Sequence, residues 1–189
     1  RYRSERGGEP VVVRVWYSVE PDSKKPDLAL KLLSFLERAR TLKGCGLSAV
    51  PRVVDFGLSR GSLLLVLQWV AGQTLPAWLK SNPGQEARMK VALSVIDGLE
   101  RLHAVELPHG DIHPGNVVVK MDGTVVFIDA LDFHKNADDV YTTAYLPPNY
   151  KALSPYERDR YSAAAVLTEV LGTSRDTPEK GALPIPRVY

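Results

Sequence analysis

The feature that most restricts the fold of this chain is the loop HGDIHPGN at residues 109–116, followed by two β-prone runs, VVVK and VVFI. The Asp122-Gly123 pair between these runs is typical of a tight hairpin turn. A hairpin brings its two ends together. We therefore expect Asn116, directly before the first run, to meet Asp129, directly after the second run, at one site.

The residue types at the two ends of this hairpin suit phosphoryl transfer from a nucleotide. That reaction needs a carboxylate to orient the acceptor hydroxyl, and an amide oxygen with a second carboxylate to hold Mg²⁺ on the phosphates. Asp111, Asn116 and Asp129 supply this set in chain order. One such residue alone is usually a turn residue, because turns favour Asp and Asn, but three at this spacing around a hairpin favour a catalytic site.

The HGDIHPGN loop, with IDAL after the hairpin, resembles the catalytic and metal-binding loops of the protein kinase-like superfamily, whose usual pattern is HRDxKxxN followed by DFG. The resemblance implies that Asp111 is the catalytic Asp and that Asn116 and Asp129 are Mg²⁺ ligands. It also implies a two-lobed α+β fold, with a small lobe of mostly antiparallel strands plus one helix and a mainly helical, incomplete large lobe. ATP would bind between the lobes.

The hydrophobic pattern predicts elements that fit this fold. Residues 1–16 are typical of a hairpin, and residues 51–57 and 61–67 of two further strands. Apolar residues at helical spacing predict helices over 27–42, capped by Asp27, and over 86–103. The expected buried stripes are Leu28, Leu32, Phe35, Ala39 and Leu42 in the first helix, and Met89, Leu93, Ile96, Leu99 and Leu102 in the second.

Within the kinase-like pattern, residues 1–67 form the small lobe without its Gly-rich phosphate loop, residues 68–75 the hinge, and residues 76–189 a partial large lobe. The large lobe would hold the catalytic loop, the metal-binding loop and an activation segment ending in TTAYLPPN. By the same resemblance, Asp159 begins a central helix that stops near Gly172 and anchors the backbone of the catalytic loop.

Two residues of the catalytic loop and two threonines carry further expectations from the resemblance. His109 matches a histidine with a packing role. Thr142 and Thr143 are candidate phosphorylation sites, although loop threonines usually belong simply to the loop. Gly110 replaces the arginine that senses such a phosphate in many protein kinases, so we expect activity that does not depend on this phosphorylation.

The resemblance further implies a set of ATP contacts. At the hinge, the carbonyl of Gln68 and the amide of Val70 would bind adenine, with Leu67 behind it. The complete set of expected cofactor contacts is Arg14, Glu37, Leu67, Gln68, Val70, His113 and Val118.

Several positions depart from the kinase pattern. Arg14 stands where the family carries a strand lysine, and Arg38 lies at the inward edge of the first helix, where a glutamate is usual. The two guanidinium groups would repel each other if they faced each other. Glu37 lies about 100° round the helix from Arg38. Either the helix rotates to bring Glu37 inward, or the usual ion pair is missing; in addition, Ala130 and Leu131 replace Phe-Gly.

We expect ATP- and Mg²⁺-dependent transfer to a Ser/Thr hydroxyl of a protein substrate or of the protein itself. Two alternatives stay open. The substitutions at Arg14 and Arg38 favour a pseudokinase that binds nucleotide as a regulatory module. The HGDxHxGN form, with His113 in place of lysine, also resembles aminoglycoside and choline phosphotransferases, which act on small molecules.

Composition restricts partners and location. The formal net charge of +2 gives no argument for a nucleic-acid surface or a polybasic membrane patch. The single cysteine, Cys45, fits a reducing, cytoplasmic compartment. The longest apolar run, residues 63–70, is far too short to span a bilayer. We therefore expect a cytoplasmic domain. The resemblance covers most of the chain but not a whole kinase, and it implies that the domain belongs to a larger multidomain protein.

Overall fold

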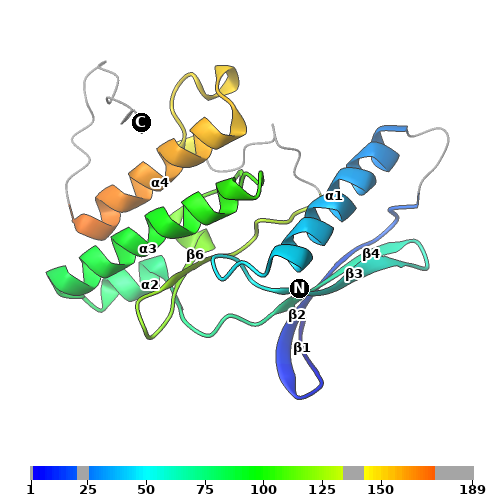
Figure 1. The fold of residues 1–189 in the computed structure, drawn as a ribbon, viewed down its shortest axis with the longest axis horizontal. Coiled ribbons are helices and arrows are strands. Elements are labelled where there is room, and N and C mark those ends of the chain that lie inside the picture. The colour runs from blue at the N-terminus through cyan, green and yellow to red at the C-terminus, as the bar shows by residue number, and fades with distance from the viewer. Residues whose placement is uncertain (1, 21–25, 134–142, 173–189) are drawn as a thin grey trace.

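The computed structural model describes residues 2–20, 26–133 and 143–172. Its first half is a four-stranded antiparallel sheet in the order β1-β2-β4-β3, with helix α1 beside it (Figure 1). The strands are β1 (Tyr2–Arg6), β2 (Glu9–Trp16), β3 (Val53–Ser59) and β4 (Ser62–Gln68). The expected N-terminal hairpin and the two later strands are confirmed.

Helix α1 (Pro26–Cys45) packs against β3 through the apolar stripe expected from its sequence. Four members of the stripe are buried, and the fifth, Leu28, is half-buried against the same core. The helix begins at Pro26, so Asp27 lies inside the first turn rather than at the cap. An acidic residue there still interacts favourably with the positive end of the helix dipole.

The second half is mainly helical and surrounds a small three-stranded sheet in the order β5-β6-β7. Residues 69–72 join β4 to this half, which lies opposite the four-stranded sheet and α1 in Figure 1. Its elements are β5 (Gln73–Thr74), α2 (Leu75–Lys80), α3 (Gln85–Ala104), β6 (Val117–Val119), β7 (Val125–Phe127), α4 (Pro155–Leu171) and the short 3₁₀ helices η1 (Pro114–Asn116), η2 (Thr143–Tyr145) and η3 (Tyr150–Ala152). A sheet-based half and a helical half confirm the expected α+β fold.

The buried face of α3 differs from the expected stripe. Only Leu99 and Leu102 of that stripe are buried, while Met89, Leu93 and Ile96 are exposed. The face that packs on β7 and α4 instead carries Val91, Ala92, Val95 and Gly98. The helix has apolar residues on two adjacent faces. The smaller residues lie inward, and at Gly98 there is little room for a side chain, because a Cβ there would come within 3.0 Å of the Phe127 ring.

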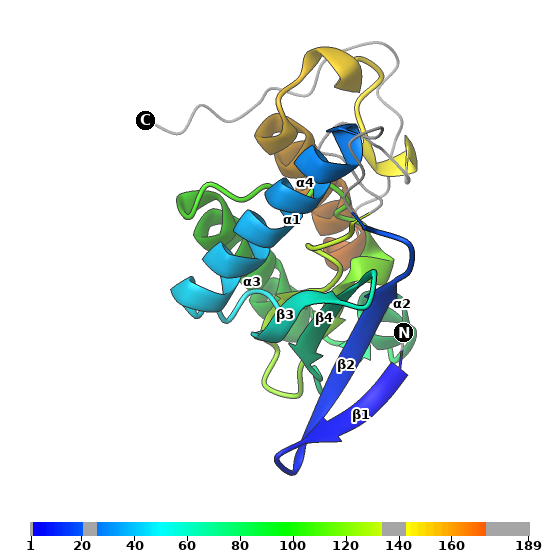
Figure 2. The ribbon, with the colours of Figure 1, turned by 90° about the vertical axis from the view of Figure 1, so that its right-hand side faces the viewer.

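Helix α4 begins at Pro155, four residues before the start expected at Asp159, because Ser154 and Glu157 cap it there. The Ser154 hydroxyl and the Glu157 carboxylate form a capping box at its N-terminus. Gly172 ends it in the left-handed conformation, with φ of 70°, as expected. Helix α4 packs along α3, and Figure 2 shows both helices on the side away from the projecting β1–β2 hairpin. Thr142 and residues 173–189 lie outside the described residues.

Among the residues that the structure describes, no helix combines the length and apolar character that a membrane crossing requires.

Candidate active site

The β6–β7 hairpin brings the two ends of the signature motif together. Val117 pairs with Phe127 in the antiparallel register, and the Ile128 amide donates to the Asn116 carbonyl at 2.9 Å. Ile128 is thus the backbone partner of Asn116, and Asp129 is the residue directly after Ile128. The hairpin that the Asp122-Gly123 turn predicted is present, and it positions a carboxylate beside the end of the catalytic loop.

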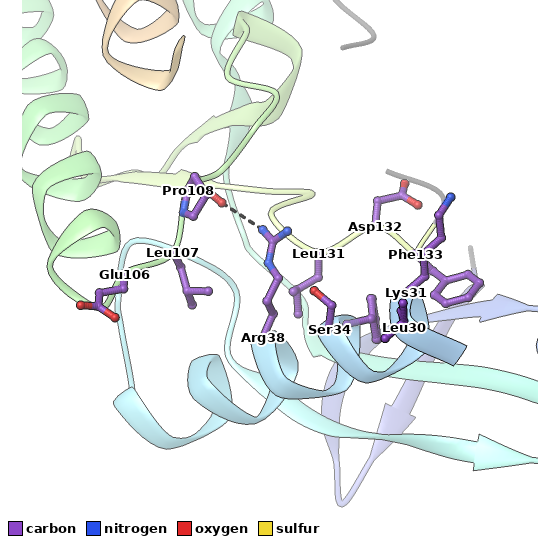
Figure 3. Close-up of a pocket in the computed structure, with 11 residues that line it drawn as sticks. Leu30, Lys31, Ser34, Arg38, Glu106, Leu107, Pro108, Leu131, Asp132 and Phe133 are labelled. Carbon is purple, nitrogen blue, oxygen red and sulfur yellow. Dashed lines mark hydrogen bonds between the residues drawn. The ribbon is translucent and has the colours of Figure 1, made fainter. Parts of the chain in front are cut away.

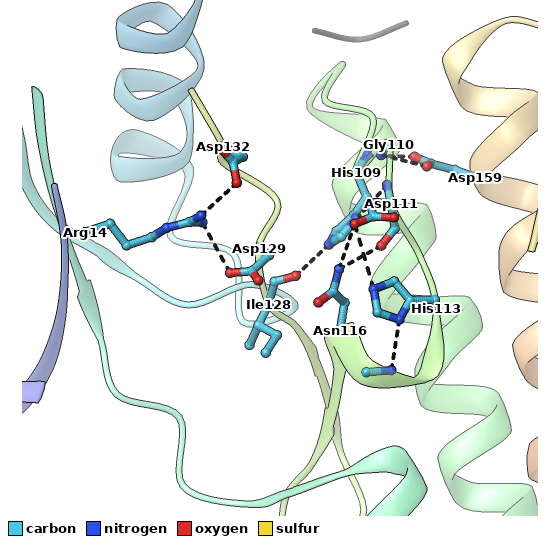
Figure 4. Close-up of polar contacts among 11 residues, drawn as sticks. Arg14, His109, Gly110, Asp111, His113, Asn116, Ile128, Asp129, Asp132 and Asp159 are labelled. Atoms are coloured by element: carbon cyan, nitrogen blue, oxygen red, sulfur yellow. Dashed lines mark hydrogen bonds and ion pairs between the residues drawn. The ribbon is translucent and has the colours of Figure 1, made fainter. Parts of the chain in front are cut away.

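Within the loop, the Asn116 side chain is bonded to Asp111. Its Nδ2 atom donates to the Asp111 carbonyl at 3.0 Å and to Asp111 Oδ2 at 3.2 Å. The one-turn helix η1 holds Asn116 in place, and the His113 ring accepts a hydrogen bond from the Gly115 amide at its start. His113 Nε2 lies 3.8 Å from Asp111 Oδ2. Asp111, His113 and Asn116 thus form one polar group at a bend of the backbone (Figure 4).

His109 links the loop at residues 109–116 to the loop that follows β7. Its Nδ1 atom accepts from the Asp111 amide at 3.2 Å, so the proton belongs on Nε2, which lies 2.9 Å from the Ile128 carbonyl. The ring also packs edge-on against Phe127. The packing role expected for His109 is therefore combined with two hydrogen bonds, one to each loop.

Asp159 of α4 holds the backbone of the catalytic loop. Its Oδ2 atom accepts from the His109 amide at 2.6 Å and its Oδ1 atom from the Gly110 amide at 2.8 Å. The His103 Nε2 atom of α3 lies 3.0 Å from Oδ2. Asp159 is only 1% exposed. A buried carboxylate that receives two backbone amides fixes the path of the loop.

Two loop residues have positive φ. Gly110 has φ of 83°, a conformation that residues with a Cβ rarely adopt. Asp129 has φ of 66°, although it does carry a Cβ. Non-glycine residues in this region cost free energy and cluster at functional sites. The segment after β7 therefore holds Asp129 in a conformation that the surrounding contacts must maintain.

Arg14 reaches from β2 into this loop (Figure 4). Its Nη1 atom lies 2.9 Å from the Leu131 carbonyl and 3.2 Å from Asp129 Oδ1, and its Nη2 atom lies 2.8 Å from Asp132 Oδ2. The Arg14 side chain is 8% exposed. It also packs over the Trp16 ring. Such a buried guanidinium, paired with two carboxylates, connects the four-stranded sheet to the loop after β7.

Arg38 of α1 also binds this segment rather than repelling Arg14. Its Nη2 atom donates to the Pro108 carbonyl at 2.9 Å (Figure 3). The same atom donates to the Ala130 carbonyl at 3.1 Å. Burial lowers the pKa of Arg38, and the Asp159 charge opposes this shift. Glu37 is exposed. The alternative in which the helix rotates Glu37 inward is therefore wrong, because α1 presents Arg38 to the loops instead.

A cavity of about 430 Å³ lies beside Arg38, between α1 and the loops (Figure 3). Residues from three segments line it: Leu30, Lys31, Ser34, Phe35, Arg38, Glu106, Leu107, Pro108, Leu131, Asp132 and Phe133. None of the residues expected to contact ATP is among them. The residues that line this cavity are therefore different from the expected ATP contacts.

The expected ATP contacts come from both halves of the described structure. Leu67 is buried at the end of β4, Gln68 is exposed, and Val70 is half-buried in the connection to β5. Val118 is buried in β6, and a Cβ on Gly72 would come within 2.8 Å of its side chain. The connection between the halves thus runs directly over the strand that follows Asn116.

The donor set fits Mg²⁺ bound together with phosphates. Mg²⁺ prefers oxygen ligands and usually takes only one or two carboxylates from a protein, with substrate phosphates and water as its other ligands. Because Asn116 Nδ2 is bonded to Asp111, its amide oxygen is the atom left for a metal, and the Asp129 carboxylate lies in the adjacent loop. The described residues contain no cluster of three His, Cys, Asp or Glu side chains suited to a metal alone.

The sheet order, the loop geometry and the Asp159 anchor together define a domain of the protein kinase-like superfamily. The particular family is identified by residues 37–137, more than half of the chain, which match the model of the ABC1 atypical kinase-like domain. The chain belongs to this family.

Curated relatives are protein kinases and a subunit of a complex. A probable serine/threonine-protein kinase PknB of Bifidobacterium longum is 32% identical over an alignment of 121 residues, and the match covers 57% of this chain and 18% of that protein. The KEOPS complex subunit Bud32 of Pyrococcus abyssi is 27% identical over 122 residues, or 64% of this chain and 54% of that protein. Serine/threonine-protein kinase Pkn1 of Myxococcus xanthus is 27% identical over 100 residues, or 52% of this chain and 14% of that protein. The chain spans little more than half of Bud32 and less than a fifth of the other two.

Sequence reasoning missed two contributors to the site. The sequence pattern assigns no role to Asp132. The available signal is that this acidic residue directly follows Leu131, an apolar residue that the fold buries. Arg38 was noted only as a departure from the family pattern. Its contacts are to carbonyl oxygens, which every residue type provides, so no side-chain pattern could have indicated them.

Proposed function

We propose that this domain transfers the γ-phosphoryl group of Mg·ATP to a Ser or Thr hydroxyl of a protein, either a separate substrate or the protein itself. The observation that carries the proposal is the double hydrogen bond from Asn116 to Asp111, beside the backbone pair that aligns Asn116 with Ile128. The grouping of Asp111, Asn116 and Asp129 at one hairpin supports the roles of base, amide and metal-binding carboxylate that this chemistry needs.

In the proposed reaction, Asp111 orients the acceptor hydroxyl and takes its proton as the new O–P bond forms and the bond from the γ-phosphorus to the ADP oxygen breaks. Asn116 and Asp129 would hold Mg²⁺, which supplies charge neutralisation on the phosphates. Asn116 orients Asp111 through its Nδ2 bonds, and Asp159 fixes the loop that carries it. Leu67, Gln68, Val70 and Val118 would contact adenine, and Arg14 and His113 the phosphates.

Location and partners are part of the same proposal. The relatives in Bifidobacterium and Myxococcus are named as protein kinases, which supports a protein acceptor. The small share of those proteins that the chain covers supports a larger multidomain protein. The single cysteine, free and exposed, supports a reducing, cytoplasmic location.

The test combines binding and transfer in the whole protein. Mg²⁺ and ATP are titrated by calorimetry, and labelled phosphate is followed onto the protein itself and onto a generic basic protein. Asp111→Ala should abolish transfer and leave nucleotide binding unchanged, while Asp97→Ala, a change at an exposed residue of α3, should alter neither. Transfer that persists in Asp111→Ala would refute its role as the base.

Nucleotide binding without transfer would favour the second candidate, a nucleotide-binding pseudokinase. One observation favours that candidate: Arg14 pairs with Asp129, the carboxylate that a transferase needs for Mg²⁺. Transfer to small aminoglycoside-like or choline-like acceptors, with none to protein, would instead favour the small-molecule phosphotransferase.

A further inference from the structure

Asp132 lies three residues after Asp129, and its Oδ2 atom is 2.8 Å from Arg14 Nη2. We infer that Asp132 is the positioning residue for Arg14 in nucleotide binding, and that it takes the part usually played by a glutamate of the small-lobe helix. The inference rests on the proposed function. It goes further because it names the residue that keeps a phosphate-binding cation in place.

The guanidinium of Arg14 is held by both of its terminal nitrogens. Nη2 is bonded to Asp132, and Nη1 is shared between the Leu131 carbonyl at 2.9 Å and Asp129 at 3.2 Å. If the Asp129 carboxylate turns to a metal ion, each nitrogen still keeps one partner. The longest of the three contacts is the one that metal binding would break. Asp132 therefore keeps Arg14 at the site throughout.

The charges also support metal binding by Asp129 and the holding of Arg14 by Asp132. One guanidinium and two carboxylates carry a net charge of about −1 in a pocket where their side chains are at most 18% exposed. A negative cluster would repel phosphates. Once a divalent cation binds Asp129, it more than offsets the charge of that carboxylate. Arg14 and Asp132 then remain as a neutral pair, and the rigid fork of Arg14 is oriented for a phosphate oxygen.

The helix cannot supply this counter-charge in the structure described. Glu37 is exposed, and the inward position of α1 is occupied by a second arginine, Arg38. Arg38 holds the Ala130 carbonyl and Arg14 holds the Leu131 carbonyl. The two arginines thus fix the backbone between Asp129 and Asp132 and determine where the Asp132 carboxylate lies.

The experiment measures the Kd of Mg·ATP by calorimetry for the wild type and for Asp132→Asn, Asp132→Glu and Asp97→Asn in the whole protein. Partners that orient a site from one shell further out usually change affinity about 10- to 100-fold when removed, so Asp132→Asn should raise the Kd about tenfold or more. Asp132→Glu keeps the charge and should restore most of the affinity. Asp97→Asn removes a carboxylate from an exposed Asp–Arg pair and should leave the Kd unchanged.

A double-mutant cycle with Arg14→Gln separates positioning from a merely structural role. If Asp132 acts through Arg14, then Asp132→Asn should have no further effect on the Kd in the Arg14→Gln background. The double variant also reduces the risk of misfolding, because Arg14 and Asp132 lose their charges together. An independent effect of Asp132→Asn in that background would overturn the inference.

The failure of this inference is distinguishable from failure of the proposed function. A wild type that binds Mg·ATP, with Asp132→Asn at equal or higher affinity, overturns the role of Asp132 alone. A wild type that does not bind Mg·ATP overturns the proposed function and this inference with it. Thermal unfolding without nucleotide, recorded for every variant, identifies any change in Kd that comes from loss of the fold.

Discussion

Nη1 of Arg14 lies 3.2 Å from Oδ1 of Asp129, so a strand arginine contacts the carboxylate proposed to bind a metal. The contact joins the two halves of the fold, because β2 belongs to the four-stranded sheet and Asp129 follows the β6–β7 hairpin (Figure 4). Arg14 is thus both a structural link between the sheets and a competitor of any cation at Asp129.

Replacing Arg14 with Met should lower the free energy of unfolding by about 3 kcal/mol, because removing one partner of a buried ion pair leaves its carboxylates without that cation. Arg52→Met is the matched control, since Arg52 pairs with Glu9 where both side chains are exposed, and such pairs contribute little. Urea denaturation measures both. Equal losses of unfolding free energy in the two variants would show that the burial of Arg14 does not determine its contribution to stability.

Asp129→Asn should reduce the effect of Mg²⁺ on ATP affinity at least about tenfold, since even residues that only support a metal ligand have effects of that size. Asp122→Asn, in the exposed turn of the same hairpin, should leave the Mg²⁺ effect unchanged. Calorimetry with and without Mg²⁺ measures the difference. An unchanged Mg²⁺ effect in Asp129→Asn would remove this residue as a ligand.

Much of the fold and of the loop geometry could be predicted because the evidence was local. The Asp-Gly turn between two β-branched runs indicated the hairpin, and this hairpin aligns Asn116 with Ile128. The capping residues of α4 likewise gave its C-terminal end at Gly172. In each case the residues that determine the structure are neighbours in the chain.

The rest depends on tertiary packing. Whether Val95 or Leu93 of α3 is buried is decided by β7 and α4, because both residues are apolar although they lie on nearly opposite faces of the helix. Likewise, the apolar stripe of α1 places Arg38 at the inward edge of the helix, but nothing local to α1 indicates what its guanidinium binds. Its partners are the carbonyl oxygens of Pro108 and Ala130, which lie far along the chain.

Gly110→Ala should lower the free energy of unfolding by about 1 kcal/mol, the cost of placing a residue with a Cβ in the left-handed region. A Cβ on Gly110 would have open space around it, so φ of 83° is the only obstacle. Gly44→Ala is the control. Its Cβ would also have open space, but Gly44 lies in helix α1, where Ala is preferred, so stability should be unchanged or higher. Equal effects in urea denaturation would contradict the conformational argument.

The capping box of α4 should make stability depend on pH. Hydrogen bonds from the Ser154 hydroxyl and then the Ser154 amide lower the pKa of Glu157. Because the pKa is lower in the folded state, ionised Glu157 stabilises α4 above its unfolded pKa of about 4, and this contribution disappears as the pH falls through the folded pKa.

Glu157→Gln should therefore lower the urea midpoint at pH 7 and have a much smaller effect at pH 3. Ser154→Ala removes the hydroxyl that contributes most to the shift, so the pH dependence due to Glu157 should shrink in that background. A Glu157→Gln effect of the same size at both pH values would show that its charge is not involved.

Asp159→Asn should affect catalysis through the loop backbone. The carboxylate accepts the His109 and Gly110 amides, one on each oxygen, and an amide side chain can offer an acceptor to only one of them. The other N–H then stays buried without its acceptor, at a cost of about 2 kcal/mol in unfolding free energy.

Because Asp111 follows directly after Gly110, the same change should reduce phosphoryl transfer more than it reduces nucleotide binding, whose expected adenine contacts lie in other segments. Transfer kinetics, calorimetry and urea denaturation on one preparation separate the three effects. Asp97→Asn, which removes a carboxylate from an exposed pair on α3, should leave transfer and binding at wild-type values. Full transfer activity in Asp159→Asn, with only stability lowered, would show that the loop keeps its geometry without this anchor.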